Sequence, residues 1–135
     1  MPELNALLQQ SGRLRLVDAA EAPQVLGEHF SFHLSDGHTP GMLLTELRTA
    51  ADGVLFCGDL IPGTPWVHLP ITMGYDRFPE RLIDEKQILV GRAQQQGMWL
   101  LLTHDAQSAA CRVGLDARGR YFADQSTSAN LCLRL

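Results

Sequence analysis

The sequence predicts an α/β fold, in which a mixed β-sheet carries helices on one face. Alternating apolar side chains over residues 28–34 indicate a strand whose two faces differ. Residues 79–97 place apolar side chains at helical spacing, which indicates an amphipathic helix. The unbroken apolar run 98–102 follows at once and indicates a strand covered on both faces. A chain of 135 residues is long enough for one hydrophobic core, so we expect a single domain.

Composition and charge exclude several classes of function. Apolar residues make up 45% of the chain and charged residues 19%, which is typical of a soluble globular protein. The net charge is −4 and the basic residues are scattered, so we expect no nucleic-acid partner. The N-terminus lacks a signal-peptide pattern, and no apolar run is long enough to cross a bilayer. We therefore expect a cytoplasmic protein without a membrane partner.

The N-terminal part is predicted to hold one helix and two strands. Leucines at helical spacing indicate a short helix over residues 4–10, which ends before Gly12. Alternation predicts strands over residues 13–18 and 28–34. In the second of these, one face carries Phe30, Phe32 and Leu34, and the other carries His29, Ser31 and His33.

The middle of the chain alternates between loops and strands. Glycine and proline interrupt the pattern over residues 35–41, which indicates a loop. Strands over 42–49 and 54–57 are joined by a good hairpin turn at 51–53. Residues 58–76 are rich in glycine and proline and are predicted to be irregular. Loops of this length inside compact domains are usually functional.

The predicted helix over residues 79–97 has clear ends and one unusual residue. Pro79 suits the first helical turn, and Gly97 suits the end. Lys86 interrupts the apolar stripe, which invites an ion pair with Asp84 or Asp76, although a side chain that extends to solvent is the simpler interpretation.

The C-terminal part is predicted less completely. Residues 113–122 indicate a hairpin that turns at residues 116–119. Residues 124–135 are too polar and irregular to assign to any element.

Three polar side chains stand directly after predicted strands. They are His38, Asp59 and His104. The ends of strands are where sheet scaffolds present functional groups on short loops. Two imidazoles and a carboxylate are donors that a divalent metal of the zinc class accepts. The sequence therefore predicts that these three residues form a metal site.

Each of these residues also has a purely structural interpretation. His38 fits a solvated or hydrogen-bonded loop residue. Asp59 follows a glycine and fits ordinary turn chemistry. Asp105, next to His104, fits the N-cap of a following helix. The spacing matches no zinc-finger motif, so the residues by themselves leave both interpretations open.

Three segments in series resemble the second half of the metallo-β-lactamase superfamily. They are Asp36-Gly37-His38-Thr39-Pro40-Gly41, Leu55-Phe56-Cys57-Gly58-Asp59-Leu60 and Leu101-Leu102-Thr103-His104-Asp105. Their order, their strand contexts and the intervening helix all fit. Further matches to one hydrolase branch are Trp66-Val67-His68-Leu69-Pro70, Met73-Gly74-Tyr75-Asp76 and Asp84-Glu85-Lys86. The resemblance covers residues 2–122, nearly the whole chain.

The resemblance implies the C-terminal half of a metallo-β-lactamase αβ/βα sandwich over residues 1–123. His38 resembles the third ligand of the first metal site, Asp59 the carboxylate that bridges both metals, and His104 a ligand of the second. Proteins of this kind hydrolyse an ester, lactone, thioester or phosphoester bond of a small molecule by metal-activated water. The implied cofactor is zinc or another divalent metal such as iron or manganese.

The sequence departs from the family in one large respect. The first half of the family's fold carries the string His-x-His-x-Asp-His, which supplies most of the ligands and does not occur here. His29 and His33 cannot replace it, because they precede His38 and share one strand face, where solvent-side histidines are the simpler interpretation. We therefore expect a truncated form that is inactive alone. The alternative is a non-catalytic, self-associating half-domain that binds metal weakly or not at all.

The long loop after Asp59 is expected to lie near the mouth of the pocket. There His68, Tyr75 and Asp76 would contact substrate. The alternative is that Trp66 and Tyr75 anchor an otherwise loose loop.

The sheet face that the first half covers in the whole fold is expected to be apolar and exposed. The expected residues of this face are Phe30, Phe32, Leu44 or Leu55. Because a patch of that size is rarely left to water, we expect a homodimer joined through this face, with two-fold symmetry.

Overall fold

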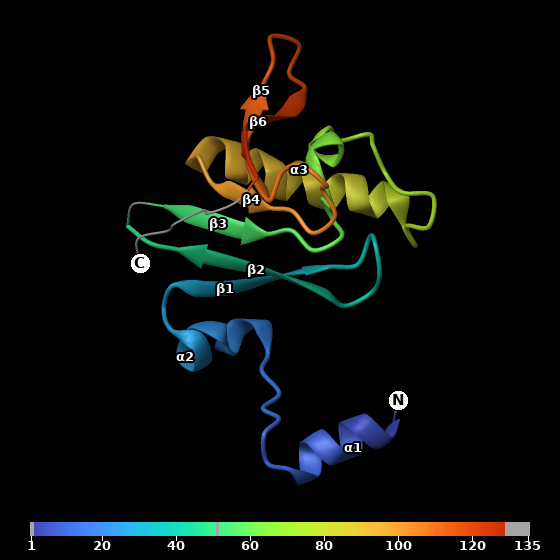
Figure 1. Cartoon of the computed structure of the whole chain (residues 1–135), viewed down its shortest axis with the longest axis vertical. Coiled ribbons are helices and arrows are strands. Elements are labelled where there is room, and N and C mark those ends of the chain that lie inside the picture. Colours follow the sequence, from blue (N-terminus) through green and yellow to red (C-terminus); the bar gives the residue numbers. More distant parts are fainter. Residues whose placement is uncertain (1, 51, 129–135) are drawn as a thin grey trace.

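The strands form one mixed sheet. A computed structural model describes residues 2–50 and 52–128, and its six strands follow the order of the chain, β1-β2-β3-β4-β5-β6 (Figure 1). They are β1 (Phe30–Ser35), β2 (Met42–Arg48), β3 (Gly53–Phe56), β4 (Trp99–Leu101), β5 (Ala110–Leu115) and β6 (Tyr121–Thr127). Neighbouring strands are antiparallel, except for the parallel pair β3 and β4. The predicted α/β fold with a mixed sheet is confirmed.

The helix α3 (Pro79–Gln96) makes the parallel pair possible, because parallel neighbours need a long crossover connection. Pro79 lies in the first turn, where its missing N–H costs no helical hydrogen bond. Gly97 ends the helix at φ +61°, a left-handed conformation that favours glycine. Both ends lie where the sequence places them. No helix in the described part of the chain is both long and apolar enough to span a membrane.

The hydrophobic core lies between α3 and one face of the sheet. Side chains alternate along a strand, so residues paired across neighbouring strands share a face. Leu55 pairs with Leu100, and Leu100 pairs with Cys111, which places all three on the α3 side. The buried apolar residues of this layer include Leu44, Leu55, Leu82, Leu89, Val90, Ala93, Leu100 and Cys111.

The opposite face of the sheet is apolar and partly open to solvent. Leu34 pairs with Leu43 on this face, and Thr45 pairs with both Phe32 and Phe56. Leu34 is 65% exposed, Leu43 42% and Phe56 43%. We use the term open face for the five apolar residues Phe30, Phe32, Leu34, Leu43 and Phe56.

The expectation that Leu44 and Leu55 belong to the exposed face is wrong. Both are buried on the α3 side of the sheet. Since successive side chains of a strand point to opposite faces, an error of one position moves a residue to the other side. The strands β2 and β3 carry apolar residues on both faces, so the pattern alone did not distinguish them. Phe30 and Phe32 do lie on the open face, and each is half-buried.

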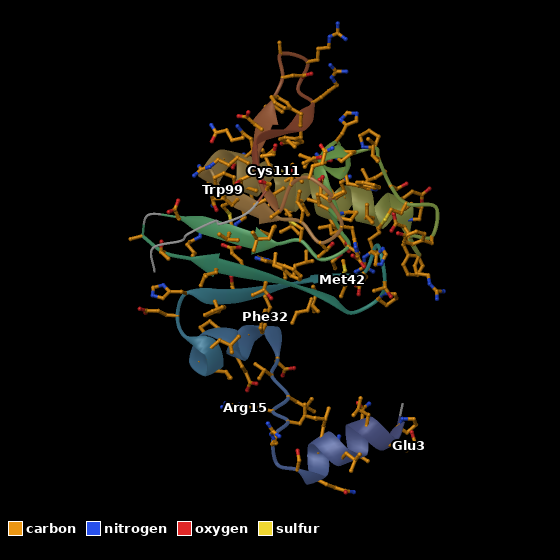
Figure 2. All side chains as sticks on the ribbon, in the orientation of Figure 1. Glu3, Arg15, Phe32, Met42, Trp99 and Cys111 are labelled. Carbon is orange, nitrogen blue, oxygen red and sulfur yellow. The ribbon has the colours of Figure 1, made fainter. Side chains whose placement is uncertain are left out.

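The N-terminal segment extends away from the sheet (Figure 1). The predicted first helix is confirmed as α1 (Pro2–Gln10), but it buries no side chain, and Glu3 and Arg15 lie well away from the strands (Figure 2). Residues 13–18 do not form the predicted strand. Alternation alone does not make a strand, because a strand also needs a neighbour with which to form hydrogen bonds. The unpredicted helices η1 (Ala19–Glu21) and α2 (Ala22–Leu26) follow, and both contact β1.

The strands β5 and β6 confirm the predicted C-terminal hairpin. At its turn, the Asp116 carboxylate accepts hydrogen bonds from the N–H groups of Arg118 and Arg120, both at 2.9 Å. The strand β6 ends at Thr127, so the first part of the unassigned segment 124–135 belongs to the sheet. Residues 129–135 lie outside the described residues.

The connection from β3 to α3 is irregular for most of its length, as predicted. Within residues 58–76, all of which are described, one short 3-10 helix occurs, η2 (Thr64–Val67). Pro65 lies in its first turn, where proline is readily accommodated.

Substitution of a core leucine tests the assignment of the two faces. We expect Leu44→Ala to lower the free energy of unfolding by about 2–5 kcal/mol, because it leaves a cavity beneath α3. Leu115, a half-exposed leucine of β5, is the control, and Leu115→Ala should cost less than about 1 kcal/mol. The measurement is urea unfolding followed by circular dichroism. Equal losses for the two variants would contradict the assignment.

Candidate metal site

The three predicted ligands lie on loops that leave one edge of the sheet. The strands β1, β3 and β4 run in the same direction, since β1 and β3 are both antiparallel to β2 and β3 is parallel to β4. His38 follows β1, Asp59 follows β3 and His104 follows β4. The carboxyl ends of strands that run the same way meet at one edge, so the strand order brings these loops together.

Asp59 stands between the two histidines. Its Oδ2 lies 3.4 Å from Nε2 of His38, and its Oδ1 lies 3.0 Å from Nε2 of His104. The side chain of His38 is 14% exposed, that of Asp59 36% and that of His104 67%. The structure therefore brings all three predicted residues together, in a cluster that opens to solvent on the side of His104.

A buried carboxylate orients the first histidine. Asp76, whose side chain is 1% exposed, places Oδ1 2.8 Å from Nδ1 of His38. Its Oδ2 accepts a hydrogen bond from the N–H of Met73 at 2.6 Å, which fixes the carboxylate. With Nδ1 held by Asp76, the Nε2 atom of His38 is the one that faces Asp59. This arrangement, a carboxylate behind an imidazole, orients the ring for a ligand on its far side.

The separations between these atoms fit a divalent metal. When His38 is neutral and donates from Nδ1, the lone pair of Nε2 faces an oxygen of Asp59, so two acceptors oppose each other. A cation between them satisfies both atoms, as does a second proton on the ring. Two zinc ligands at about 2.1 Å from the ion and at a tetrahedral angle lie roughly 3.4 Å apart. The observed separations of 3.0 and 3.4 Å are close to this value.

The described residues do not complete a site for a single ion. Within residues 2–50 and 52–128, no three His, Cys, Asp or Glu side chains are grouped so that they could hold one metal. The reason is that the two oxygens of Asp59 face different imidazoles, so each His–Asp pair offers two donors to a different position. Two donors leave half of a four-coordinate zinc shell to other ligands.

Cys57 lies in the segment that leads to Asp59 and is not part of this donor set. Its thiol is fully buried in the core, and burial raises the pKa of the thiol far above its ordinary range. Only the thiolate binds metal well, so Cys57 is a core residue.

Short contacts fix the loops that carry Asp59 and His104. The hydroxyl of Thr103 donates to the carbonyl of Gly58 at 3.0 Å, and the N–H of His104 donates to the carbonyl of Pro62 at 2.8 Å. Gly58 has φ +49°, a left-handed conformation that lets the chain turn directly before Asp59. These bonds join the two loops across the parallel strand pair.

The loop that carries His38 packs directly on α3. A Cβ atom on Gly37 would lie 2.4 Å from the Cα of Leu82, so only glycine permits this approach. The carbonyl of Gly37 accepts from the N–H of Phe78 at 2.8 Å, and the carbonyl of His38 accepts from the N–H of Arg77 at 3.2 Å. The position of His38 therefore depends on the start of α3.

The three residues predicted to contact substrate occupy different places. The ring of Tyr75 is 71% exposed and meets His38 edge-on, with 5.9 Å between the ring centres. Asp76 is buried behind His38, on the side away from Asp59. His68 lines a separate hollow together with Asp116, Arg120, Tyr121 and Phe122. Of the three, Tyr75 is the side chain that lies exposed beside the cluster.

Asp105 ties the loop after β4 to the first residue of η2. Its carboxylate accepts hydrogen bonds from the N–H and hydroxyl of Thr64, at 2.8 and 2.7 Å, and from the N–H groups of Gln107 and Ser108, both at 2.9 Å. These bonds, those from Thr64 above all, lower the pKa of Asp105 to about 2. No helix follows in residues 106–109, so the expected N-cap role of Asp105 is wrong, although its carboxylate does bind nearby N–H groups.

Two polar side chains that the sequence placed toward solvent are paired or buried. His33 lies on the α3 side of the sheet, where its Nε2 is 2.7 Å from Oε2 of the buried Glu46. Lys86 is fully buried and donates to backbone carbonyls. The signal for Lys86 was its position within an apolar stripe, which indicates burial as readily as a side chain that extends to solvent.

Comparison with known proteins identifies the fold. No protein-family model and no curated protein sequence matches the chain. The crystal structure of AbOPH, a hydrolase in the β-lactamase superfamily, aligns with a TM-score of 0.75 and 17% identity over 93% of this chain. The chain shares the fold of part of this β-lactamase-superfamily hydrolase. AidC, a dizinc quorum-quenching lactonase, aligns with a TM-score of 0.69 and 19% identity over 93% of the chain. A probable metal-dependent hydrolase from Staphylococcus aureus aligns with a TM-score of 0.62 and 24% identity over 73%.

The shared fold covers only part of each known protein. The chain spans 42% of AbOPH, 43% of AidC and 36% of the staphylococcal protein. The predicted resemblance to part of a metallo-β-lactamase hydrolase is thus confirmed at the level of the fold.

The low pKa of Asp105 predicts an acid-dependent loss of stability. A carboxyl group with a folded pKa of about 2 and an ordinary value of 3.8 stabilises the fold above the ordinary value, and this contribution disappears as the pH falls through the folded one. We therefore expect Asp105→Asn to be less stable than the parent chain at about pH 7, and the difference to shrink between about pH 4 and pH 2. Urea unfolding over a pH series measures it.

The control for this prediction is Asp84→Asn, at an aspartate on α3. It should leave stability nearly unchanged at both ends of the series. A difference between Asp105→Asn and the parent that persists unchanged down to about pH 2 would show that the carboxylate is not the stabilising group.

Proposed function

We propose that His38, Asp59 and His104 are metal ligands of a hydrolytic centre in which Asp59 bridges two divalent ions. The observation that supports this most directly is the geometry of Asp59, because its two oxygens face the Nε2 atoms of two different histidines at 3.4 and 3.0 Å. The fold shared with a dizinc lactonase and with a probable metal-dependent hydrolase supports the same conclusion. Imidazole and carboxylate donors favour zinc, with iron or manganese as alternatives.

The neighbouring residues receive distinct roles in this proposal. Asp76 holds the Nδ1 atom of His38 and keeps Nε2 directed at the ion, so it is a positioning residue rather than a contact to substrate. Tyr75 lies exposed beside His38 and is the candidate contact to substrate. The separate hollow lined by His68 gives no support to a role in the same pocket.

The proposed reaction is hydrolysis of an ester, lactone, thioester or phosphoester bond in a small molecule. Divalent metals at such a centre lower the pKa of water toward neutrality and polarise the bond that is cleaved. His38, Asp59 and His104 would hold the ions, and Asp59 would keep the two positive charges close together. Since the described residues offer two donors to each position, the remaining ligands have to come from elsewhere. We therefore propose that the chain alone hydrolyses such substrates little or not at all.

Zinc binding tests the ligand assignment. We expect the purified chain to bind at most about one zinc ion, and weakly, since neither position has a full set of protein ligands among the described residues. Asp59→Asn should weaken binding at least about tenfold, because loss of a direct ligand costs no less than loss of a residue behind one. His38→Ala and His104→Ala should have similar effects. The measurement is isothermal titration with zinc, together with elemental analysis after gel filtration.

His29→Ala is the matched control, since His29 is an exposed histidine outside the cluster, and it should bind zinc as the parent does. Two tightly bound zinc ions per monomer would refute the proposal of incomplete positions. A robust hydrolytic rate that is lost in both His38→Ala and Asp59→Asn would show that the chain assembles a complete centre by itself.

The second candidate function is a non-catalytic, self-associating half-domain, and the open face is the observation that favours it. We propose that two copies of the chain associate through this face. The known proteins of this fold have more than half of their length outside the part that this chain matches, so they can cover the equivalent face with their own chain. A second copy of the chain offers an apolar surface of the same kind, and two-fold symmetry would set Leu34, Leu43 and Phe56 against the same residues. Burial is worth about 25 cal/mol per Å² of apolar area before the costs of association.

The molar mass in solution tests this association. We expect light scattering to report a dimer at micromolar concentration and Leu43→Asp to give a monomer, because the substitution places a charge on the open face, beside Leu34. Leu115→Asp is the control, since Leu115 is a 47% exposed residue at the end of β5, outside the five residues of that face, and it should remain dimeric. A parent chain that is a stable monomer at micromolar concentration would refute the proposal.

A further inference from the structure

Glu85, on α3, binds the segment that leads into His38. One oxygen of its carboxylate accepts from the hydroxyl of Ser35 at 2.7 Å and from the N–H of Gly37 at 3.1 Å. The other oxygen accepts from the N–H of Asp36 at 2.9 Å. A carboxylate that accepts several hydrogen bonds from one short segment fixes the path of that segment. His38 is the next residue along the chain.

Lys86, the next residue on α3, binds the segment that leads to Asp76. Its side chain is 0% exposed, and Nζ donates to the carbonyls of His68 at 2.9 Å, Leu69 at 3.1 Å and Ile71 at 2.9 Å. An ammonium group has three N–H donors, and all three are used on this one loop. Burial lowers the pKa of Lys86 to about 8, while the charge of Asp76 acts in the opposite direction. Burying a lysine ammonium group costs free energy. A lysine that is nevertheless buried and bonded to one loop is therefore expected to have a structural role.

The two side chains match the two segments in chemistry. Glu85 accepts from N–H groups, whereas Lys86 donates to carbonyls, so neither could replace the other. The segment 68–71 continues to Met73 and Asp76, which are joined by a hydrogen bond of 2.6 Å. The segment 35–37 continues to His38, whose Nδ1 is 2.8 Å from Asp76. Both held segments therefore converge on the His38–Asp76 contact.

We propose that Glu85 and Lys86 together form a clamp that positions the His38–Asp76 contact and thereby directs Nε2 of His38 toward Asp59. Both are positioning residues, because they act through the loops and touch no ligand of the proposed site. The inference rests on the proposed function only for the identity of the ligand that Nε2 of His38 binds. The orientation of the imidazole is a property of the chain without metal.

The test compares Lys86→Met, which removes the three donors but keeps a long side chain, with Glu85→Gln, which removes the negative charge. The control is Leu89→Ala, at a buried core residue of the same helix, which should lower stability without touching either loop. Nitrogen NMR of the metal-free protein at about pH 7.5, where an ordinary histidine is mostly neutral, shows which ring nitrogen of His38 carries the proton. Zinc titration and urea unfolding are measured on the same samples.

We expect the parent and Leu89→Ala to hold the proton of His38 on Nδ1, the nitrogen bound to Asp76. Lys86→Met should give a mixture of the two ring forms and weaken zinc binding about tenfold, the usual effect of losing support behind a ligand. Glu85→Gln should act in the same direction. If a loss of global stability alone caused these effects, Leu89→Ala would change the ring form of His38 and the zinc affinity as Lys86→Met does. A change in Lys86→Met that is absent in Leu89→Ala therefore reports positioning rather than folding.

Unchanged ring signals of His38 in both Lys86→Met and Glu85→Gln would overturn the clamp. If Lys86→Met does not fold, Glu85→Gln decides the question alone. A shift of the His38 ring form in a chain that binds no zinc at all would support the clamp and refute the proposed metal site. The two proposals therefore fail separately.

Discussion

The site depends on the close contact between the loop of His38 and the first turns of α3. Because Gly37 has no side chain, its backbone reaches the backbone of Leu82, and the loop forms hydrogen bonds with the residues that precede the helix. This contact determines where His38 lies relative to the edge of the sheet. Asp59 lies in the turn after β3, and Asp76 belongs to the long loop. Both contact His38 only when His38 is held in this position.

The helix α3 has two structural roles, and different residues of the helix perform them. Its apolar side chains, such as Leu82 and Val90, cover the sheet and form the core. Glu85 instead holds the end of β1 and the start of the loop after it, and Lys86 holds the irregular segment 68–71. Charged groups near a core usually reduce stability unless every donor and acceptor is matched. Here Lys86 is matched by three backbone carbonyls, and Glu85 by two backbone N–H groups, the Ser35 hydroxyl and Arg81, so both charged groups have hydrogen-bond partners.

The two faces of the sheet differ in a way that bears on function. The α3 side is a complete core, whereas the open face leaves large apolar side chains exposed. The cluster around Asp59 is likewise partial, since each His–Asp pair supplies two donors. The partial cluster concerns chemistry and the open face concerns assembly, and each has its own physical requirement. A metal position needs more donors, and an apolar surface needs cover from water.

The sequence alone determined the fold class, most of the elements and the three residues of the cluster. Alternation and helical spacing are local properties, so β1, α1, α3 and the β5–β6 hairpin could be located without knowing their partners. The strand predicted over residues 13–18 is wrong, because a strand needs a neighbouring strand for its hydrogen bonds and a local pattern does not show whether one is present. Leu44 and Leu55 were placed on the wrong face because the pattern of β2 and β3 is apolar on both sides.

Only the tertiary structure decided which polar residues support the cluster. Asp76 was predicted to contact substrate, yet it lies behind His38, and Lys86 was expected to reach solvent, yet it is buried. The alternative interpretation of Asp105 as a helix cap is wrong, because its carboxylate joins the loop after β4 to Thr64 of η2. The physical reason is the same in all three cases. A carboxylate or an ammonium group bonds with whichever donors or acceptors the fold brings to it, and those partners lie 15 or more positions away in the case of Lys86. Residue type therefore specified what each side chain can bind, and the packing of the loops on α3 selected what it does bind.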